Sequence, residues 1–295
     1  MDPIVLYHEP QLNNPVMIAA WPGMGGVAIV AAKYLAEQLD AEEFGSIEPD
    51  EFFDLAGVAV EDAVIRELGV PEGKFYFWQN GEGKDLIIFM AEAQPHMKGY
   101  ALANAVVDMA QRFRVTRLFT FAAAPTHIYH TNRPKVLAAA TSPRLARELE
   151  KYDVAPLKEG SITGLNGLLL GVAKSRDVEG VCLLAEIPIY TTQVANPRSS
   201  KAVLEVLRQM TGVEMDLSEI DSWAQETDKE VEEKMSELKE SYGDEARELI
   251  DYYERLAAQK GGMGLQADFS SEELVKDIER FLREKGDEGG DKGGN

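Results

Sequence analysis

The chain has 295 residues, of which 45% are apolar, and a formal net charge of −21. This length allows one large or two ordinary domains with a sizeable core. An acidic surface without a basic stripe argues against nucleic acid as a partner, and no apolar run of about 18 residues predicts a membrane span. The N-terminus lacks the basic start and long apolar stretch of a signal peptide. The single cysteine, Cys182, excludes a disulfide framework and predicts a buried core residue, so we expect a cytoplasmic protein.

Strand-like and helix-like patterns alternate from residue 3 to about residue 212, which is typical of an α/β sheet with helices on its faces. We expect strands at residues 4–7, 16–20, 85–91, 117–121, 135–140 and 180–185. Residues 73–81 alternate and end in turn residues, which predicts a hairpin with the strand at 85–91. Helices are expected at residues 26–38, 98–113, 142–152, 164–174 and 197–211, the last with Asn196 as its N-cap.

Beyond residue 213 the pattern becomes helical and strongly acidic, with 25 acidic and 11 basic residues up to residue 295. An apolar stripe recurs every three or four residues, which predicts one long helix or a helical hairpin buried against another surface. The stripe consists of Ile220, Trp223, Thr227, Val231, Met235, Leu238 and Tyr242, and it resumes over residues 246–256. We therefore divide the chain into an α/β domain at 1–213 and an amphipathic helical region at 214–260. Residues 261–295 are expected to hold a hinge, a short helix and a disordered acidic tail.

A glycine-rich turn between the expected strand 16–20 and the next helix is the first candidate site. Gly23, Gly25 and Gly26, followed by Ala28, satisfy the G-x-G-x-x-G/A dinucleotide pattern. Bare N–H groups at such a turn favour an anion. The acidic partner expected about 20 positions further on would be residue 42, 43 or 48, yet none of these glutamates clearly ends a second strand. The same residues are also consistent with a turn whose glycines serve only close packing, and we favour this interpretation.

Two glutamates follow expected strands and form the second candidate. Glu92 comes after the strand at 85–91, and Glu186 after the strand at 180–185. Open α/β sheets bind ligands at the carboxyl ends of their strands, where two carboxylates could act as acid and base. Alternatively, each carboxylate caps a neighbouring turn or pairs with a lysine or arginine. We favour this alternative because no nucleophile or metal set accompanies them.

A second glycine-rich turn, at residues 160–167, opens the expected helix at 164–174. Thr163 or Ser161 could cap this helix, and Asn166 could present its amide to a ligand. The glycines also form a small-residue edge that favours close helix packing, which is the safer interpretation.

His127 and His130 have the spacing of a metal pair only if they lie on a helix, and nearby prolines predict a loop. A third ligand is not evident, so we expect no metal, and we predict no cofactor.

Three segments in order resemble the PAC2 family: the Trp-Pro-Gly-Met-Gly-Gly turn at 21–26, Gly-Ser-Ile-Thr-Gly-Leu-Asn-Gly-Leu-Leu-Leu at 160–170, and Leu-Ala-Glu-Ile-Pro-Ile-Tyr at 184–190. The resemblance covers about residues 4–220. It implies a three-layer α/β/α sandwich of the phosphorylase/hydrolase-like kind, usually in a homo-oligomer, for which we expect a trimer. The family is named after a eukaryotic proteasome assembly chaperone, and it offers no established catalytic set. Prokaryotic members are often labelled ATP-grasp relatives, but this chain has no ATP-grasp phosphate loop or magnesium-carboxylate pattern.

Two functions remain open, and with them the question whether the protein is an enzyme. The first is a non-catalytic interaction or assembly factor whose C-terminal helices bind a protein partner or form the oligomer. The second is a nucleoside- or nucleotide-type enzyme or binder that uses the turn at 23–26, with Glu92 or Glu186 as acid/base. Some archaeal relatives dock on the proteasome through a C-terminal hydrophobic–tyrosine tail. This chain ends Lys-Gly-Gly-Asn, so we do not expect that docking mode.

Overall fold

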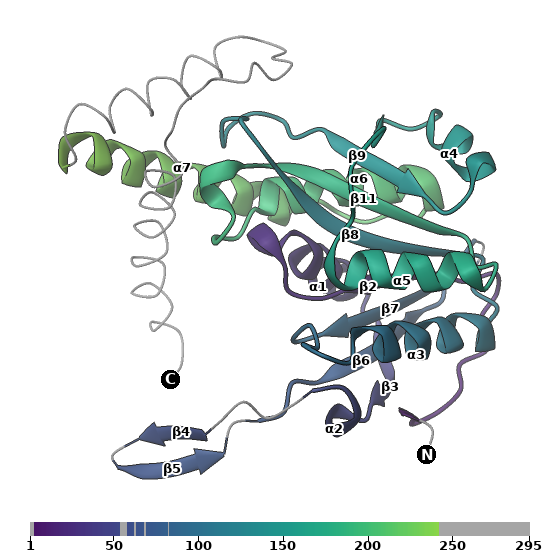
Figure 1. Cartoon of the computed structure of the whole chain (residues 1–295). Helices are drawn as coiled ribbons and strands as arrows, with labels where there is room; N and C mark the ends of the chain where they lie inside the picture. The colour runs from purple at the N-terminus through teal and green to yellow at the C-terminus, as the bar shows by residue number, and fades with distance from the viewer. Residues whose placement is uncertain (1–2, 54–57, 62, 68, 82, 242–295) are drawn as a thin grey trace.

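A mixed sheet of nine strands forms the centre of the computed structural model, which describes residues 3–53, 58–61, 63–67, 69–81 and 83–241 (Figure 1). The strand order is β1-β3-β6-β7-β2-β8-β11-β9-β10. These strands span Ile4–Leu6 (β1), Val16–Ala20 (β2), Glu42–Ile47 (β3), Gly73–Trp78 (β6), Leu86–Ala91 (β7), Arg117–Thr126 (β8), Val136–Ala140 (β9), Ala155–Pro156 (β10) and Gly180–Pro188 (β11). The four strands β7, β2, β8 and β11 run parallel. A separate antiparallel hairpin joins β4 (Val58–Glu61) and β5 (Val64–Glu67).

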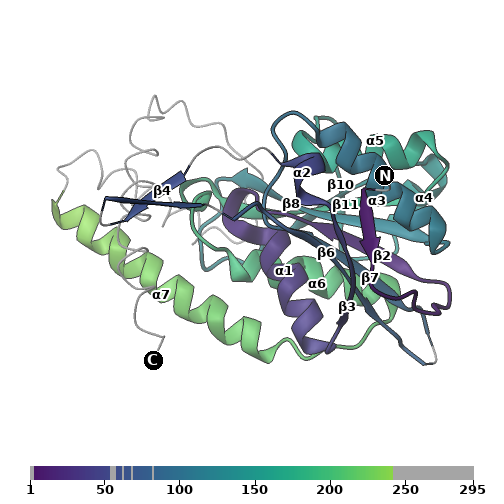
Figure 2. The ribbon, with the colours of Figure 1, turned by 90° about the horizontal axis from the view of Figure 1, so that it is seen from below.

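Helices cover both faces of this sheet, which confirms the expected three-layer sandwich (Figures 1 and 2). Helices α1 and α6 pack on one face, and α3 and α5 on the other. The α-helices span Val27–Gln38 (α1), Pro49–Phe52 (α2), Gly99–Arg112 (α3), Pro143–Leu149 (α4), Gly164–Ser175 (α5), Pro197–Thr211 (α6) and Ser218–Ser241 (α7). Two 3₁₀ turns, η1 (Met24–Gly26) and η2 (Ile189–Thr191), precede α1 and α6.

The central strand β2 is buried at every position. Val16 and Ile18 face the α1–α6 layer, whereas Met17 faces the α3–α5 layer. A strand that is covered on both faces has a continuous apolar sequence, and for this reason β2 could be predicted. Cys182 of β11 is buried as predicted, and burial raises the pKa of its thiol to about 11.

Several elements differ from the sequence expectations. Strand β8 continues through Pro125, which pairs with Ile187 of β11, so this proline does not end the strand. Strand β3, helix α2 and the β4–β5 hairpin were not predicted. In β3, a β-carbon on Gly45 would lie 2.8 Å from the carbonyl oxygen of Val5. The glycine and the leading glutamates of β3 remove the apolar alternation by which a strand is recognised.

Helix α7 begins the acidic C-terminal region, and it packs on α6. Ile220 is fully buried in the cluster that contains the α1 and α6 side chains, and the Tyr34 hydroxyl donates to the carbonyl oxygen of Asp216 at 2.8 Å. Trp223, also in the predicted stripe, is 41% exposed. The elements expected at 246–256, 261–264 and 270–295 lie outside the described residues. Among the described helices, none is long and apolar enough to cross a membrane.

Candidate functional site

The carboxyl ends of β7, β2, β8 and β11 meet at one edge of the sheet because these four strands are parallel. Helices α1, α3 and α6 follow β2, β7 and β11 along the chain, and α5 precedes β11, so their N-termini also lie at this edge. The two glycine-rich turns and both candidate glutamates are therefore found here. Ligands of open α/β sheets bind at such an edge.

The glycine turn after β2 uses its N–H groups within the protein. Gly25 N–H donates to the carbonyl oxygen of Thr192 at 2.6 Å, and Gly26 N–H donates to that of Gly23 at 3.0 Å. Both Gly25 and Gly26 have positive φ, at +61° and +60°, a backbone conformation that glycine adopts without cost. Two of the donors that would bind an anion thus hold the turn itself together.

Asn196 also binds this turn, through the Gly25 carbonyl group. Its backbone N–H donates to the carbonyl oxygen of Gly25 at 2.8 Å. Its side-chain Nδ2 donates to the carbonyl oxygens of Thr191 and Val194, at 2.9 and 2.8 Å, and Oδ1 accepts the Thr191 hydroxyl at 2.9 Å. Asn196 occupies the predicted N-cap position of α6, but its side chain makes no capping bond to the helix. It binds the preceding turn instead.

Gln94 joins the two glycine-rich turns. Its Nε2 donates to the carbonyl oxygen of Pro22 at 2.9 Å, and its Oε1 accepts the N–H of Leu165 at 3.2 Å. Thr163 sits at the N-cap of α5, but its side chain makes no capping bond. The cap of α5 therefore comes from Gln94, 71 residues away in the chain. This cap could not be predicted from the sequence, because a cap from a distant segment has no fixed spacing.

Asn166 lies in the first turn of α5, beside β8. Its Nδ2 donates to the carbonyl oxygen of Phe121 at 3.1 Å. Its Oδ1 is buried and has no hydrogen-bond partner within the described part of the chain. Among the described residues of the predicted site, this oxygen is a buried acceptor that remains available to a donor.

Glu92 and Glu186 make the same kind of contact at two separate places. Glu92 N–H donates to the carbonyl oxygen of Glu72 at 2.8 Å, and its Oε2 accepts the N–H of Glu72 at 2.9 Å. Glu186 pairs in the same way with Lys135, at 2.9 and 3.0 Å. Their strands, β7 and β11, are separated by β2 and β8, so the two backbones are about 14 Å apart at the usual strand spacing. The structure does not bring these carboxylates together.

The glutamates considered as the acidic partner of the dinucleotide pattern do not lie beside β2. Glu48 does follow a strand, β3, contrary to the expectation that none of the three glutamates ends one. However, β6 and β7 separate β3 from β2, and β3 pairs antiparallel with β6. A dinucleotide fold requires the second strand parallel and adjacent to the first.

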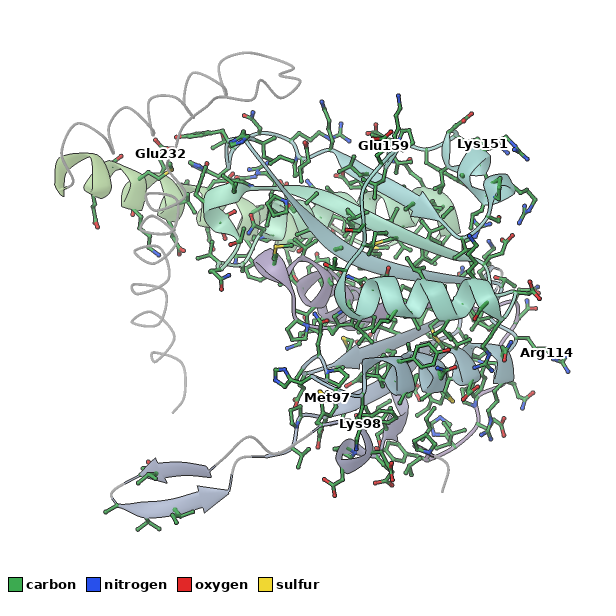
Figure 3. All side chains as sticks on the ribbon, viewed as in Figure 1. Met97, Lys98, Arg114, Lys151, Glu159 and Glu232 are labelled. Atoms are coloured by element: carbon green, nitrogen blue, oxygen red, sulfur yellow. The ribbon has the colours of Figure 1, made fainter. Side chains whose placement is uncertain are left out.

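His130 forms a buried polar cluster that the sequence did not predict. His127 and His130 lie in the loop between β8 and β9, as expected, with His127 exposed and His130 buried. The Tyr190 hydroxyl lies 3.1 Å from both the backbone N and the Nδ1 of His130. His130 Nε2 lies 3.1 Å from Oε2 of Glu232, which also accepts the Tyr129 hydroxyl at 2.6 Å. Figure 3 labels Glu232 on helix α7. Burial lowers the pKa of His130, and the Glu232 carboxylate opposes this shift.

The contact of Nε2 with Glu232 favours one tautomer of neutral His130. The Glu232 carboxylate is an acceptor, which favours the ring proton on Nε2. In this tautomer Nδ1 is an acceptor and faces the Tyr190 hydroxyl at 3.1 Å. Ion pairs of Arg198 with Asp228 and of Lys201 with Asp221 add to the attachment of α7 to α6. Over the described residues, no group of three or more histidine, cysteine, aspartate or glutamate side chains could hold a metal ion.

Comparison with known proteins agrees with this architecture. The family model of the PAC2 family matches residues 17–235. The chain belongs to the PAC2 family. An uncharacterised protein of Methanocaldococcus jannaschii is 28% identical over 219 residues, which cover 73% of this chain and 81% of the relative.

Two solved structures of Pyrococcus furiosus are similar to this PAC2 protein. PbaB, described as an archaeal proteasome activator, is 27% identical with a TM-score of 0.66, covering 79% of this chain and 99% of PbaB. PbaA, described as an archaeal homolog of proteasome-assembly chaperone, has a TM-score of 0.62 at 24% identity, covering 86% of this chain and 99% of PbaA. At that identity, PbaA supports the fold alone.

Proposed function

We propose that this PAC2 protein is a non-catalytic assembly factor that acts on other proteins as a homo-oligomer in the cytoplasm, with a trimer as the expected form. The observation that supports the proposal is that the polar groups at the carboxyl edge of the sheet form hydrogen bonds within the protein. Gly25, Gln94, Glu92 and Glu186 all bond to backbone groups of the protein itself. Groups used in this way stabilise a rigid framework on which a partner can dock.

The similarity to PbaB suggests the first partner to test, the subunits of the 20S proteasome. We expect the contact to use the folded body or the C-terminal helices rather than the last residues of the chain. The full chain is mixed with purified proteasome α and β subunits from the same organism. Co-sedimentation, light scattering and peptidase activity of the mixture are then measured against the subunits alone.

The expected result is a complex that changes the rate of proteasome assembly or its peptidase activity. A variant without residues 292–295 is the matched control, and it should give the same complex. If the full chain neither binds nor changes assembly or activity, the proteasome is excluded as the partner. If the variant without residues 292–295 no longer binds, the proposed docking mode is wrong.

A nucleoside- or nucleotide-type ligand is the second candidate function, and the buried, unpartnered Oδ1 of Asn166 is the observation that favours it. Thermal unfolding in the presence of nucleotides, nucleosides and inorganic phosphate provides the test. A ligand at 100 times its Kd adds about 2.7 kcal/mol of stability. The gain should disappear in Asn166→Leu and persist in Asn104→Leu, which changes a half-buried asparagine whose Nδ2 donates to the Tyr100 carbonyl oxygen within α3. No gain with any of these compounds would exclude this class of ligand.

A further inference from the structure

One face of helix α7 is attached to the body of the protein. Four apolar side chains along this face are buried, namely Ile220, Ala224, Val231 and Met235. Acidic side chains beside them also bind the body, since Asp228 pairs with Arg198 and Glu232 approaches His130. Figures 1 and 2 show that α7 extends past the sheet. The attachment of α7 therefore explains the residues on this face and leaves the opposite face to be explained.

The opposite face of α7 carries an exposed tryptophan. Trp223 is 41% exposed, whereas Trp21 in the core is 1% exposed. Exposed acidic residues continue from Trp223 along the same face at intervals of three or four positions. They are Glu219, Glu226, Glu230 and Glu233. Residues three or four apart are neighbours on a helix surface, so the indole and the four carboxylates form one surface, which we call the α7 outer face.

The folding of the chain does not account for the α7 outer face. None of its four glutamates makes an ion pair within the part of the chain that the structure describes, unlike Asp221 and Asp228 on the inner side. Like charges three or four residues apart destabilise a helix, and residues 218–237 hold eight acidic and two basic residues. Tryptophan is also enriched among the residues that dominate protein–protein interfaces. These features are typical of a surface that binds another molecule.

The charge of the α7 outer face selects the kind of partner. The same face of a second copy would be repelled, because it carries the same charge. We propose that the α7 outer face binds a basic segment of a partner protein, whose lysine or arginine side chains pair with the glutamates and lie against the Trp223 ring. A cation is attracted to the face of an indole, so the tryptophan and the carboxylates recognise the same group. The inference rests on the proposed assembly role and names the chemistry of the partner.

The test uses a defined probe, a helical peptide of leucine and lysine, together with its counterpart of leucine and glutamate. Binding of each peptide to the full-length protein is measured by isothermal titration calorimetry. The face variant carries Glu226→Gln and Glu230→Gln. The charge-matched control carries Glu150→Gln and Glu159→Gln, which change two exposed glutamates outside α7. A third variant carries Trp223→Ala, and circular dichroism establishes that all of them are folded.

We expect the leucine–lysine peptide to bind, and the face variant and Trp223→Ala each to weaken this binding about tenfold, as the loss of a dominant interface residue does. The charge-matched control should bind as the unmodified chain does. Tyr7→Ala, which removes another exposed aromatic side chain, should also leave binding unchanged. The fluorescence of Trp223 should shift to the blue on binding, because its indole leaves water.

Four results would overturn the proposal: no binding of the leucine–lysine peptide, equal binding of the two peptides, equal weakening in the face variant and the charge-matched control, or unchanged binding by Trp223→Ala. A changed molar mass of the Trp223→Ala protein in light scattering would also overturn it, because the α7 outer face would then join copies of the chain. If the peptide binds as expected and the proteasome subunits do not, the docking surface stands and the proteasome is excluded. If the subunits bind and the peptide does not, the assembly role stands and the docking surface is wrong.

Discussion

Gly25 and Asn196 are bonded through their backbones across 171 residues of sequence, with the Asn196 N–H 2.8 Å from the Gly25 carbonyl oxygen. A β-carbon on Gly25 would lie 2.7 Å from Nδ2 of Asn196. That Nδ2 is committed to two carbonyl oxygens, so it cannot yield without breaking them. The glycine turn and the turn before α6 therefore form one packed unit.

Gly25→Ala should lower the free energy of unfolding by about 2–4 kcal/mol. A non-glycine residue at positive φ costs about 1–2 kcal/mol, and a clash with a hydrogen-bonded side chain adds a similar amount. Gly26→Ala is the matched control in the same turn. It has the same φ, but its β-carbon would make only an ordinary contact with Val30, at 3.6 Å. Urea unfolding measures both variants, and equal losses would contradict a specific clash with Asn196.

Gln94→Leu should destabilise the N-terminal turn of α5 more than the rest of the protein. The change removes one donor and one acceptor, each worth about 0.5–1.5 kcal/mol. Hydrogen exchange provides the local readout, and the Leu165 amide should exchange faster because it loses its acceptor. Gln79→Leu is the control, since Gln79 Nε2 donates to the carbonyl oxygen of Gln11 far from α5. Unchanged protection at Leu165 would show that Gln94 is not the cap.

The central fold could be predicted because its signals are local. Strands such as β2 are long apolar runs bounded by turn residues, and α6 begins and ends at the predicted residues, 197 and 211. The β4–β5 hairpin was not predicted. Its four strand residues with described side chains, Val60, Glu61, Val64 and Ile65, are all exposed, so burial does not impose an alternation on them. Strand β3 was not predicted because it contains Gly45, which interrupts the apolar pattern of a strand. This position holds glycine because the backbone of Val5 approaches it closely, and not because of apolar packing.

The candidate site was only partly accessible to sequence reasoning. The sequence pattern identified which residues lie at the carboxyl edge of the sheet, because the alternation of strands and helices along the chain determines which turns lie at that edge. It could not identify their partners, since the bonds of Gln94 to Leu165 and of Gly25 to Asn196 join segments far apart in the chain. The His130 cluster was missed for the same reason. Tyr129 and His130 come from the β8–β9 loop, Tyr190 from η2 and Glu232 from α7, with no common spacing.

Ile220→Ala should lower the free energy of unfolding by about 2–5 kcal/mol, the usual loss for a fully buried isoleucine. Ile220 lies in the same core cluster as the α1 and α6 side chains, so we propose that α7 unfolds together with the α/β body. Trp223→Ala, on the same helix at a partly exposed position, is the control and should cost much less. Thermal unfolding in two separate transitions would contradict a single cooperative unit.

Stability should fall in mild acid because of His130. Burial holds the pKa of His130 below its ordinary value of about 6.5. In the pH range between the folded pKa and about 6.5, the unfolded chain binds a proton that the folded chain does not. The free energy of unfolding therefore decreases as pH falls through this range, and the decrease ends below the folded pKa. His130→Gln should remove this part of the pH dependence.

Glu232→Gln gives an independent check. The Glu232 carboxylate raises the pKa of His130 against the effect of burial, so its removal should move that pKa further down and extend the sensitive range to lower pH. An NMR titration of the His130 ring measures this shift directly. An upward shift in Glu232→Gln would mean that the carboxylate is not the charge that His130 faces across the α7 contact.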